Sequence, residues 1–330
     1  MFRSALSLFL ALVASLGFST AEAQVRRVTE LNTTQIRALD RSKTLVILPG
    51  GILEEHGPYL PAYTDGVLSE RLTDELARGI AAQKPGWTVL VFPQVPLGAS
   101  GSNELGGHFS FPGTYAVRPS TLRAAFMDLA TELGDQGFRW IFVVHVHGAP
   151  LHNRALDQAG DYFHDVYGGR MVHLWGLIPV LGGWGSALQG LTDAQKKEEG
   201  VSLHAGMDET SLLLYLKPEL VSPLYKEAPI VTGATLAQAF DATKPASWPG
   251  YLGSPRQSSA ALGETIWKSF AAAALEVSLK ILDGVDPATF PRYADYLEKQ
   301  PLYQEWIRAA NERDAALEAK QRAWLEKQKK

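Results

Sequence analysis

Residues 48–65 join a predicted strand to a predicted helix, and they place three metal-competent side chains at that junction. The apolar run over residues 44–48 predicts a buried strand, and the residues after Asp65 have the apolar spacing of a helix. Glu54 and His56 are two residues apart, so in an extended backbone their side chains point the same way. Open α/β sheets bind their ligands at the carboxyl ends of the strands. The stretch therefore predicts an α/β fold with a candidate metal site at this edge of the sheet.

Each of these side chains also has a simpler interpretation. Asp65 could cap the helix that follows, because an aspartate at that position satisfies free N–H groups. A lone Glu-x-His pattern is a weak signal for metal binding. Glu55, which stands between the two candidate ligands, is expected to be a solvated charge.

Two further histidine motifs occur at a predicted loop and at a predicted strand end. Residues 107–114 read Gly-His-Phe-Ser-Phe-Pro-Gly-Thr and follow a long loop rich in Gly, Pro and Ser, which makes His108 a loop residue. Residues 139–144 predict a strand that runs into His145 and His147. A histidine beside a Gly turn at a strand's carboxyl end can reach a ligand in a cleft. The residues alone favour a buried, hydrogen-bonded core position for His145.

The last motif, residues 203–211, reads Leu-His-Ala-Gly-Met-Asp-Glu-Thr-Ser and contains His204 and Glu209. A helix is predicted to start here, so a carboxylate at Glu209 also has a structural explanation in the helix dipole.

Together these motifs resemble the creatininase (creatinine amidohydrolase) family over residues 28–283. The family signatures are close to Glu-x-His-Gly-x-His-Leu-Pro-x-x-Thr-Asp, His-x-x-Phe-Pro-Gly-Thr and His-Ala-Gly-x-x-Glu-Thr-Ser. This chain matches them with one exception, since Tyr59 replaces the second histidine of the first signature. Members that hydrolyse creatinine also have a glutamate ligand where this chain has Ala149. These two departures argue against creatinine itself as the substrate more than against metal binding.

The resemblance implies a site with two divalent ions, Zn²⁺ and/or Mn²⁺, and with Asp65 as the bridging carboxylate. It assigns catalytic roles to His204, as the proton shuttle, and to Glu209, which would be a ligand or the holder of one. The implied metal ligands are Glu54, His56, Asp65, His147 and Glu209. The implied pocket residues are Tyr59, His108, His145, Trp175 and Trp184. For the two tryptophans, a flat apolar ring suits a small planar amide, but core packing or a subunit contact would explain them as well.

These residues predict a metal-dependent amidohydrolase that cleaves a C–N bond of a small cyclic or linear amide. A water held between two ions loses a proton near neutral pH and can attack an amide carbonyl. The leaving nitrogen then needs a proton, for which His204 is the candidate donor. A peptidase-like member that trims a short peptide would use the same ions in a more open cleft. A non-catalytic metal-binding or scaffold homologue is the third interpretation, which Ala149 favours and the retained His204 opposes.

Residues 1–23 are predicted to be a signal peptide. They have a positively charged start, an apolar run over residues 5–18 that is short for a membrane span, and a small-x-small cleavage pattern before Gln24. An uncleaved membrane anchor is the alternative. The mature chain is expected to begin at Gln24, to be periplasmic or secreted, and to have no membrane partner after cleavage.

The composition narrows the expected partners. The formal net charge of −4 argues against a nucleic-acid-binding protein, which would usually have a basic surface. The chain has no cysteine, so an exported form must be stabilised by its core rather than by disulfides. The expected partners are a small-molecule amide and further copies of the chain, in a hexamer by resemblance.

Strand and helix patterns alternate along the chain, which predicts a three-layer αβα fold with a mainly parallel sheet, creatininase-like by resemblance. The hydrolase domain is expected to span residues 24–286. Residues 287–330 are predicted to form a charged helical extension with Trp306 among its apolar anchors, and its outer part, residues 311–330, is expected to be either solvated or packed on a neighbouring subunit. Residues 192–200 are predicted to be an exposed, charged helix.

Overall fold

The centre of the protein is a five-stranded parallel sheet, seen in a computed structural model that describes residues 24–182 and 189–329. The strand order is β1-β3-β2-β4-β5, and every neighbouring pair is parallel. The strands are β1 (Gln24–Arg27), β2 (Thr44–Gly50), β3 (Thr88–Val91), β4 (Trp140–His145) and β5 (Arg170–His173). All-parallel pairing follows from the alternation of strands and helices, because each helix returns the chain to the same end of the sheet.

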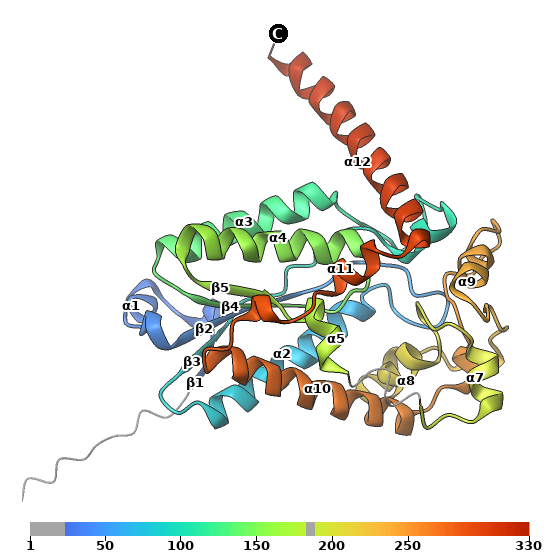
Figure 1. Ribbon diagram of the computed structural model, residues 1–330, viewed down its shortest axis with the longest axis horizontal. Helices are drawn as coiled ribbons and strands as arrows, with labels where there is room; N and C mark the ends of the chain where they lie inside the picture. The colour runs from blue at the N-terminus through green and yellow to red at the C-terminus, as the bar shows by residue number, and fades with distance from the viewer. Residues whose placement is uncertain (1–23, 183–188, 330) are drawn as a thin grey trace, which may run out of the picture.

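Helices cover both faces of this sheet, so the predicted three-layer fold is confirmed (Figure 1). On one face lie α2 (Thr64–Gln83) and α10 (Ala260–Leu282); on the other lie α3 (Pro119–Asp135) and α4 (Pro150–Tyr167). Leu45 and Ile47 of β2 belong to the core on the α2 and α10 side, whereas Val46 and Leu48 belong to the core on the α3 and α4 side. Successive side chains of a strand point to opposite faces, and a strand buried on both faces therefore reads as a continuous apolar run.

Shorter helices complete the fold. They are α1 (Thr33–Arg37), α5 (Ile178–Leu181), α7 (Asp193–Glu199), α8 (Met207–Leu216) and α9 (Leu236–Thr243). Helix α8 packs against α10. An antiparallel bridge between His204 and Leu252 holds the segment that leads into α8.

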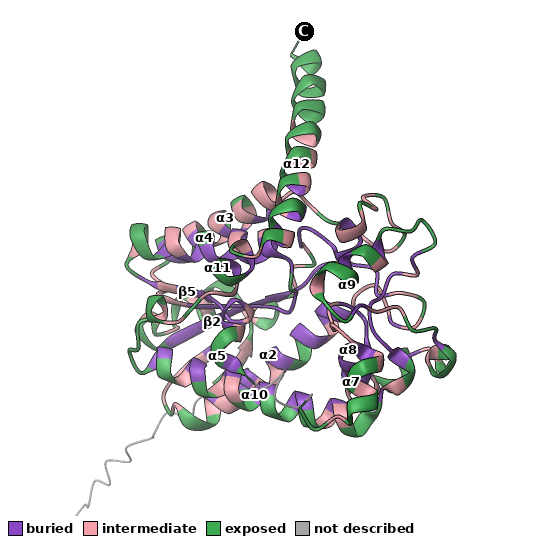
Figure 2. Cartoon of the chain, turned by 45° about the vertical axis from the view of Figure 1, so that its right-hand side comes forward, coloured by how far each residue is buried: buried purple, intermediate pink, exposed green. Residues whose placement is uncertain are grey.

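The C-terminal extension forms α11 (Tyr293–Glu298) and α12 (Pro301–Gln328). The predicted helical extension is therefore present, and its anchor Trp306 is buried. Tyr303 and Trp306 are buried against residues of the same chain, in a cluster with Ala149 and Phe240. Only the outer part of α12 projects away from the body and is exposed, as Figures 1 and 2 show.

The predicted exposed helix over residues 192–200 also needs a correction at its end. Most of α7 is exposed, but Glu199 is buried. Its carboxylate accepts hydrogen bonds from the backbone N–H groups of Met207, at 3.0 Å, and Ser254, at 2.6 Å. This carboxylate therefore ties α7 to the first turn of α8, next to the motif with Glu209.

Two predictions fall partly or wholly on residues that the structure does not describe. The predicted signal peptide, residues 1–23, and the predicted pocket residue Trp184 lie outside the described ranges. Among the helices within those ranges, none has the combination of length and apolarity that crossing a bilayer requires.

Candidate metal centre

Three segments that are distant in sequence meet at the carboxyl end of the sheet. The loop after β2 contains Glu54 and His56, and the first turn of α2 contains Asp65. His147 follows β4, the neighbour of β2 in the sheet. His204 and Glu209 come from the segment that enters α8. All of these side chains are buried except that of Glu209, which is 18% exposed.

Hydrogen bonds to backbone carbonyl oxygens orient the three histidine rings. His56 Nδ1 lies 3.0 Å from the carbonyl oxygen of Glu54, and His147 Nε2 lies 3.1 Å from that of Ser100. His204 Nε2 lies 2.7 Å from the carbonyl oxygen of Glu55. Because a carbonyl oxygen only accepts, each of these nitrogens carries a hydrogen. The other nitrogen of each ring is then left to face the carboxylates, as in histidines that bind metals.

Asp65 lies between two groups of these potential ligands. Its Oδ1 is 3.4 Å from His56 Nε2, which is itself 3.8 Å from Glu209 Oε2. Its Oδ2 is 3.0 Å from His147 Nδ1, which is 3.1 Å from Glu54 Oε2. Both sets, and a third of Glu54, His56 and His204, are compact enough to hold a metal ion. A carboxylate shared in this way has the geometry of a bridging ligand.

The electrostatics of the cluster reflect the close approach of carboxylates and imidazoles. Burial alone would raise the pKa of Glu54, but His147 and His204 outweigh it and hold that pKa well below the ordinary range. Burial likewise opposes the charged form of His147, yet Glu54 and Asp65 raise the pKa of this ring well above its usual value. The pKa of His204 rises to about 10, because Glu54 and Glu55 outweigh the effect of burial. Each shift indicates that the centre favours positive charge among its carboxylates.

The residues present fit a divalent metal ion. His56 Nε2 and Asp65 Oδ2 are buried and have no hydrogen-bond partner, which is costly for polar atoms. A nitrogen lone pair that faces a carboxylate oxygen needs a positive charge between them, which a proton or a metal ion can supply. Carboxylate oxygens with imidazole nitrogens are the donor set that zinc and manganese accept.

The structure corrects the prediction that Glu55 is a solvated charge, since only 4% of the residue is exposed. Its Oε1 lies 3.3 Å from His204 Nε2, and its Oε2 accepts a hydrogen bond from the Gly57 N–H. Glu55 thus holds the ring of His204 in place. The partner residue is 149 positions away in the sequence, so no local pattern could indicate this role.

Sequence reasoning also missed Ser100, Ser102 and Ala205, whose backbones support the site. The Ser102 N–H donates to Glu54 Oε1, and the Ala205 N–H donates to Glu209 Oε2 at 2.5 Å. Ser100, whose carbonyl orients His147, and Ala205 are the two non-glycine residues with positive φ in the described chain. Backbone strain of this kind persists at sites where surrounding contacts over-determine it. No sequence signal marks Ser100 or Ser102, and the motif that contains Ala205 does not reveal the role of its backbone N–H.

The predicted pocket residues separate into two groups. Trp175 lines a cavity of about 60 Å³ at the metal centre, together with His147, His204 and Glu209. The other three described candidates lie elsewhere: His145 is wholly buried against Phe126, His108 stacks on Trp248, and Tyr59 packs beside Tyr251. The remaining lining includes residues of the C-terminal extension, which the sequence did not indicate.

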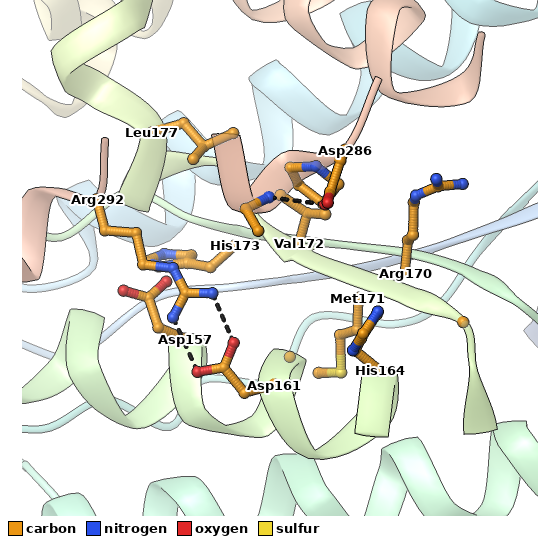
Figure 3. Close-up of a pocket in the computed structure, with 14 residues that line it drawn as sticks. Asp157, Asp161, His164, Arg170, Met171, Val172, His173, Leu177, Asp286 and Arg292 are labelled. Atoms are coloured by element: carbon orange, nitrogen blue, oxygen red, sulfur yellow. Dashed lines mark hydrogen bonds and ion pairs between the residues drawn. The ribbon is translucent and has the colours of Figure 1, made fainter. Parts of the chain in front are cut away.

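A second cavity, of about 130 Å³, lies between α4 and the segment that leads to α11 (Figure 3). Arg292 forms a two-bond ion pair with Asp161 there, at 2.5 and 2.8 Å. Asp157 is also buried at this cavity, and its Oδ2 has no hydrogen-bond partner. Burial, only partly offset by Arg292, raises the pKa of Asp157 to about 7.

This pKa predicts how Asp157→Asn changes stability with pH. The unfolded aspartate is already ionised at pH 5. The folded Asp157 still holds its proton at pH 5 and loses it as the pH rises to 8. The wild-type free energy of unfolding should therefore fall by roughly 2 to 3 kcal/mol more than that of the variant over this range. Denaturant unfolding at both pH values measures the difference. Asp165→Asn, at an exposed position of the same helix, should behave like wild type, and equal pH dependence in all three chains would contradict the assignment.

Comparisons with known proteins identify a matching family and several relatives. The profile of the creatininase family, described as creatinine amidohydrolase, matches residues 29–278. The chain is 30% identical over 248 residues to the mycofactocin precursor peptide peptidase of Mycolicibacterium smegmatis, covering 72% of this chain and 85% of that protein. It is 28% identical over 190 residues to the creatinine amidohydrolase of Pseudomonas putida, covering 54% of this chain and 66% of that protein.

Solved structures show the same fold. A crystal structure of creatinine amidohydrolase (creatininase) aligns with a TM-score of 0.59 and 24% identity, over 78% of this chain and 97% of that chain. A structure described as "Creatininase Mn" aligns with a TM-score of 0.58 and 23% identity, over 78% and 98% of the two chains. The family profile ends before the C-terminal extension.

Proposed function

The chain belongs to the creatininase family of hydrolases, and from this premise we propose that it is a metal-dependent enzyme that cleaves the C–N bond of a small amide. The observation that carries the proposal is the position of Asp65. One of its oxygens faces His56, and the other faces His147, so a single carboxylate joins two groups of ligands.

In this proposal one ion is held by Glu54, Asp65 and His147, and a second by His56, Asp65 and Glu209. Zinc or manganese suits this mixture of oxygen and nitrogen donors. Such ions would polarise an amide carbonyl and lower the pKa of water at the site. The buried position of the ligands keeps bulk water away from the reacting groups.

His204 is the proposed proton donor to the leaving nitrogen. Its Nε2 is held by the backbone and side chain of Glu55, so its Nδ1 is directed towards Glu54 Oε1, at 4.0 Å, in the cavity. Glu55, whose Oε1 lies 3.3 Å from Nε2, stabilises the protonated ring, which is the state that a general acid needs.

Metal content tests the proposed site. Elemental analysis of purified wild-type protein should give two ions per chain, and Glu209→Ala should lose one of them, because Glu209 belongs to only one of the two groups. Glu305→Ala removes an exposed glutamate and should leave both ions. One ion in wild type, or two in Glu209→Ala, would contradict the assignment of a two-ion centre with Glu209 as a ligand.

Hydrolysis of a substrate panel tests the reaction. Cyclic amides, linear amides and short peptides should be compared by release of amine or ammonia. Turnover of small amides that stops on metal removal and returns with zinc or manganese supports the proposal. A second candidate is the trimming of a short peptide, which the name of the Mycolicibacterium smegmatis relative favours. Faster hydrolysis of the short peptides than of the small amides would support this second candidate.

We also propose that the protein is exported, to the periplasm or the medium, and that it assembles as a homo-oligomer. N-terminal sequencing of the protein from its native compartment should begin at Gln24 if the signal peptide is removed. Light scattering of the purified chain tests the oligomer.

A further inference from the structure

Aromatic side chains from the C-terminal extension cover the metal centre. Tyr293 begins α11, and Tyr303 and Trp306 lie in the first turns of α12. All three line the same cavity as Glu54, His147 and His204. The family profile ends at residue 278, so this wall is an addition to the part of the chain that matches the family.

The wall is attached to the loop that supports Glu54. Trp306 donates its indole N–H to Glu104 Oε2, at 3.2 Å, and Arg313 lies 3.4 Å from Glu104 Oε1. Glu104 is buried, and it lies two residues after Ser102, whose N–H donates to Glu54. The position of Trp306 is therefore coupled through one short segment to a proposed metal ligand.

Ion pairs fix the extension to α4 as well. Arg154 makes two bonds to Glu298, both 2.7 Å long, and a further bond to Asp295 at 2.6 Å. Arg292 makes its two bonds to Asp161 on the same helix (Figure 3). Paired guanidinium–carboxylate bonds define orientation as well as distance. The aromatic wall is thus held over the cavity at several points along the extension.

The small side chain of Ala149 makes room for the aromatic rings of the C-terminal extension. It is buried in the same cluster as Tyr303 and Trp306, and it lines the cavity beside Gly148. A glutamate at this position would extend into the volume that the aromatic rings fill. The cavity that remains is less than half the size of the second cavity, at about 60 Å³ against about 130 Å³.

We propose that Tyr293, Tyr303 and Trp306 are specificity-determining residues that restrict the metal centre to a compact, uncharged amide and exclude bulky acyl groups. The proposal rests on the proposed function, because it takes the metal centre as the place where the substrate reacts. The wall itself carries no charge: burial raises the pKa of Tyr293 to about 12, so its phenol stays neutral under ordinary conditions.

Binding of hydroxamates to the cobalt-loaded protein tests this proposal without requiring turnover. Hydroxamates coordinate metal ions, and the visible spectrum of cobalt reports their binding. Wild type should bind acetohydroxamate and bind naphthylhydroxamate much more weakly. Trp306→Ala should tighten the bulky probe by about tenfold or more and change the small one little. Trp324→Ala, the same substitution at a 60% exposed position of the same helix, should match wild type.

Tyr293→Ala is a second variant, chosen because Tyr293 is only half-buried and its loss should disturb folding less than the loss of Trp306. Unchanged dissociation constants for both probes in the folded variants would overturn the proposal that these aromatic residues limit the size of the substrate. A wild-type protein that binds no cobalt would overturn the proposed function and this proposal together. Cobalt binding with the expected preference for the small hydroxamate, but without hydrolysis of any amide, would reject the proposed reaction. The proposed size restriction by the aromatic residues would still be supported.

Discussion

Glu54→Gln is expected to lose one of the two proposed ions and to abolish hydrolysis. Glu54 belongs to two of the three ligand groups, and its Oε2 lies 3.1 Å from His147 Nδ1. Glutamine has nearly the same shape and can still accept the Ser102 N–H, but it carries no negative charge. An ion among neighbouring carboxylates and imidazoles then loses a charged ligand at a site where little water can replace it.

The expected loss of activity is large. Metal ions lower the activation barrier by several kcal/mol. Loss of an ion should therefore reduce kcat/KM by roughly 10³-fold or more. Elemental analysis and kinetics on the same preparations measure both effects. Glu276→Gln is the matched control, because that glutamate is exposed and forms an ion pair with Lys280 on the protein surface. A Glu54→Gln protein with full metal content would remove Glu54 from the proposed ligands.

His204→Ala is expected to retain metal and lose turnover. The ring lies 4.4 Å from that of His56, but His204 belongs to neither of the two ligand groups assigned to the proposed ions, so both ions should remain without it. Loss of a general acid usually lowers the rate by about 10² to 10⁴-fold. The fall should be confined mainly to kcat, because the proton transfer occurs after binding.

His164→Ala is the control for this substitution, since His164 is exposed on α4 and does not line the cavity that contains His204. Metal content equal to wild type in His204→Ala, with kcat reduced, supports the role of proton donor. Loss of an ion would instead assign His204 to the metal, as its grouping with Glu54 and His56 allows. Unchanged turnover would reject both roles.

The central sheet could be predicted because its signals are local. The apolar run of β2, followed by the periodic apolar residues of α2, indicates a buried strand and a covering helix without reference to the rest of the chain. Edge strand β1 could not be predicted in the same way. Its sequence, Gln-Val-Arg-Arg, is short and polar, and it becomes a strand by pairing with β3.

The same distinction applies to the site. Glu54, His56, Asp65 and His147 were assigned as ligands because their motifs resemble those of the creatininase family, and the structure brings them together. Glu55 and Glu199 were both expected to be exposed charges. Each is buried because its partners come from far along the chain, from His204 for Glu55 and from Ser254 for Glu199. A charged residue has no local pattern that reveals such a partner.

The sequence by itself determined the class of fold and the set of potential metal ligands, because apolar periodicity and short motifs are properties of neighbouring residues. Only the tertiary structure decided that Asp65 lies between two ligand groups and that Trp306 covers them. Trp306 meets Glu104 across 202 positions of the chain. Contacts of this length depend on how whole layers pack, since burial of a polar group is favourable only where a distant partner satisfies it.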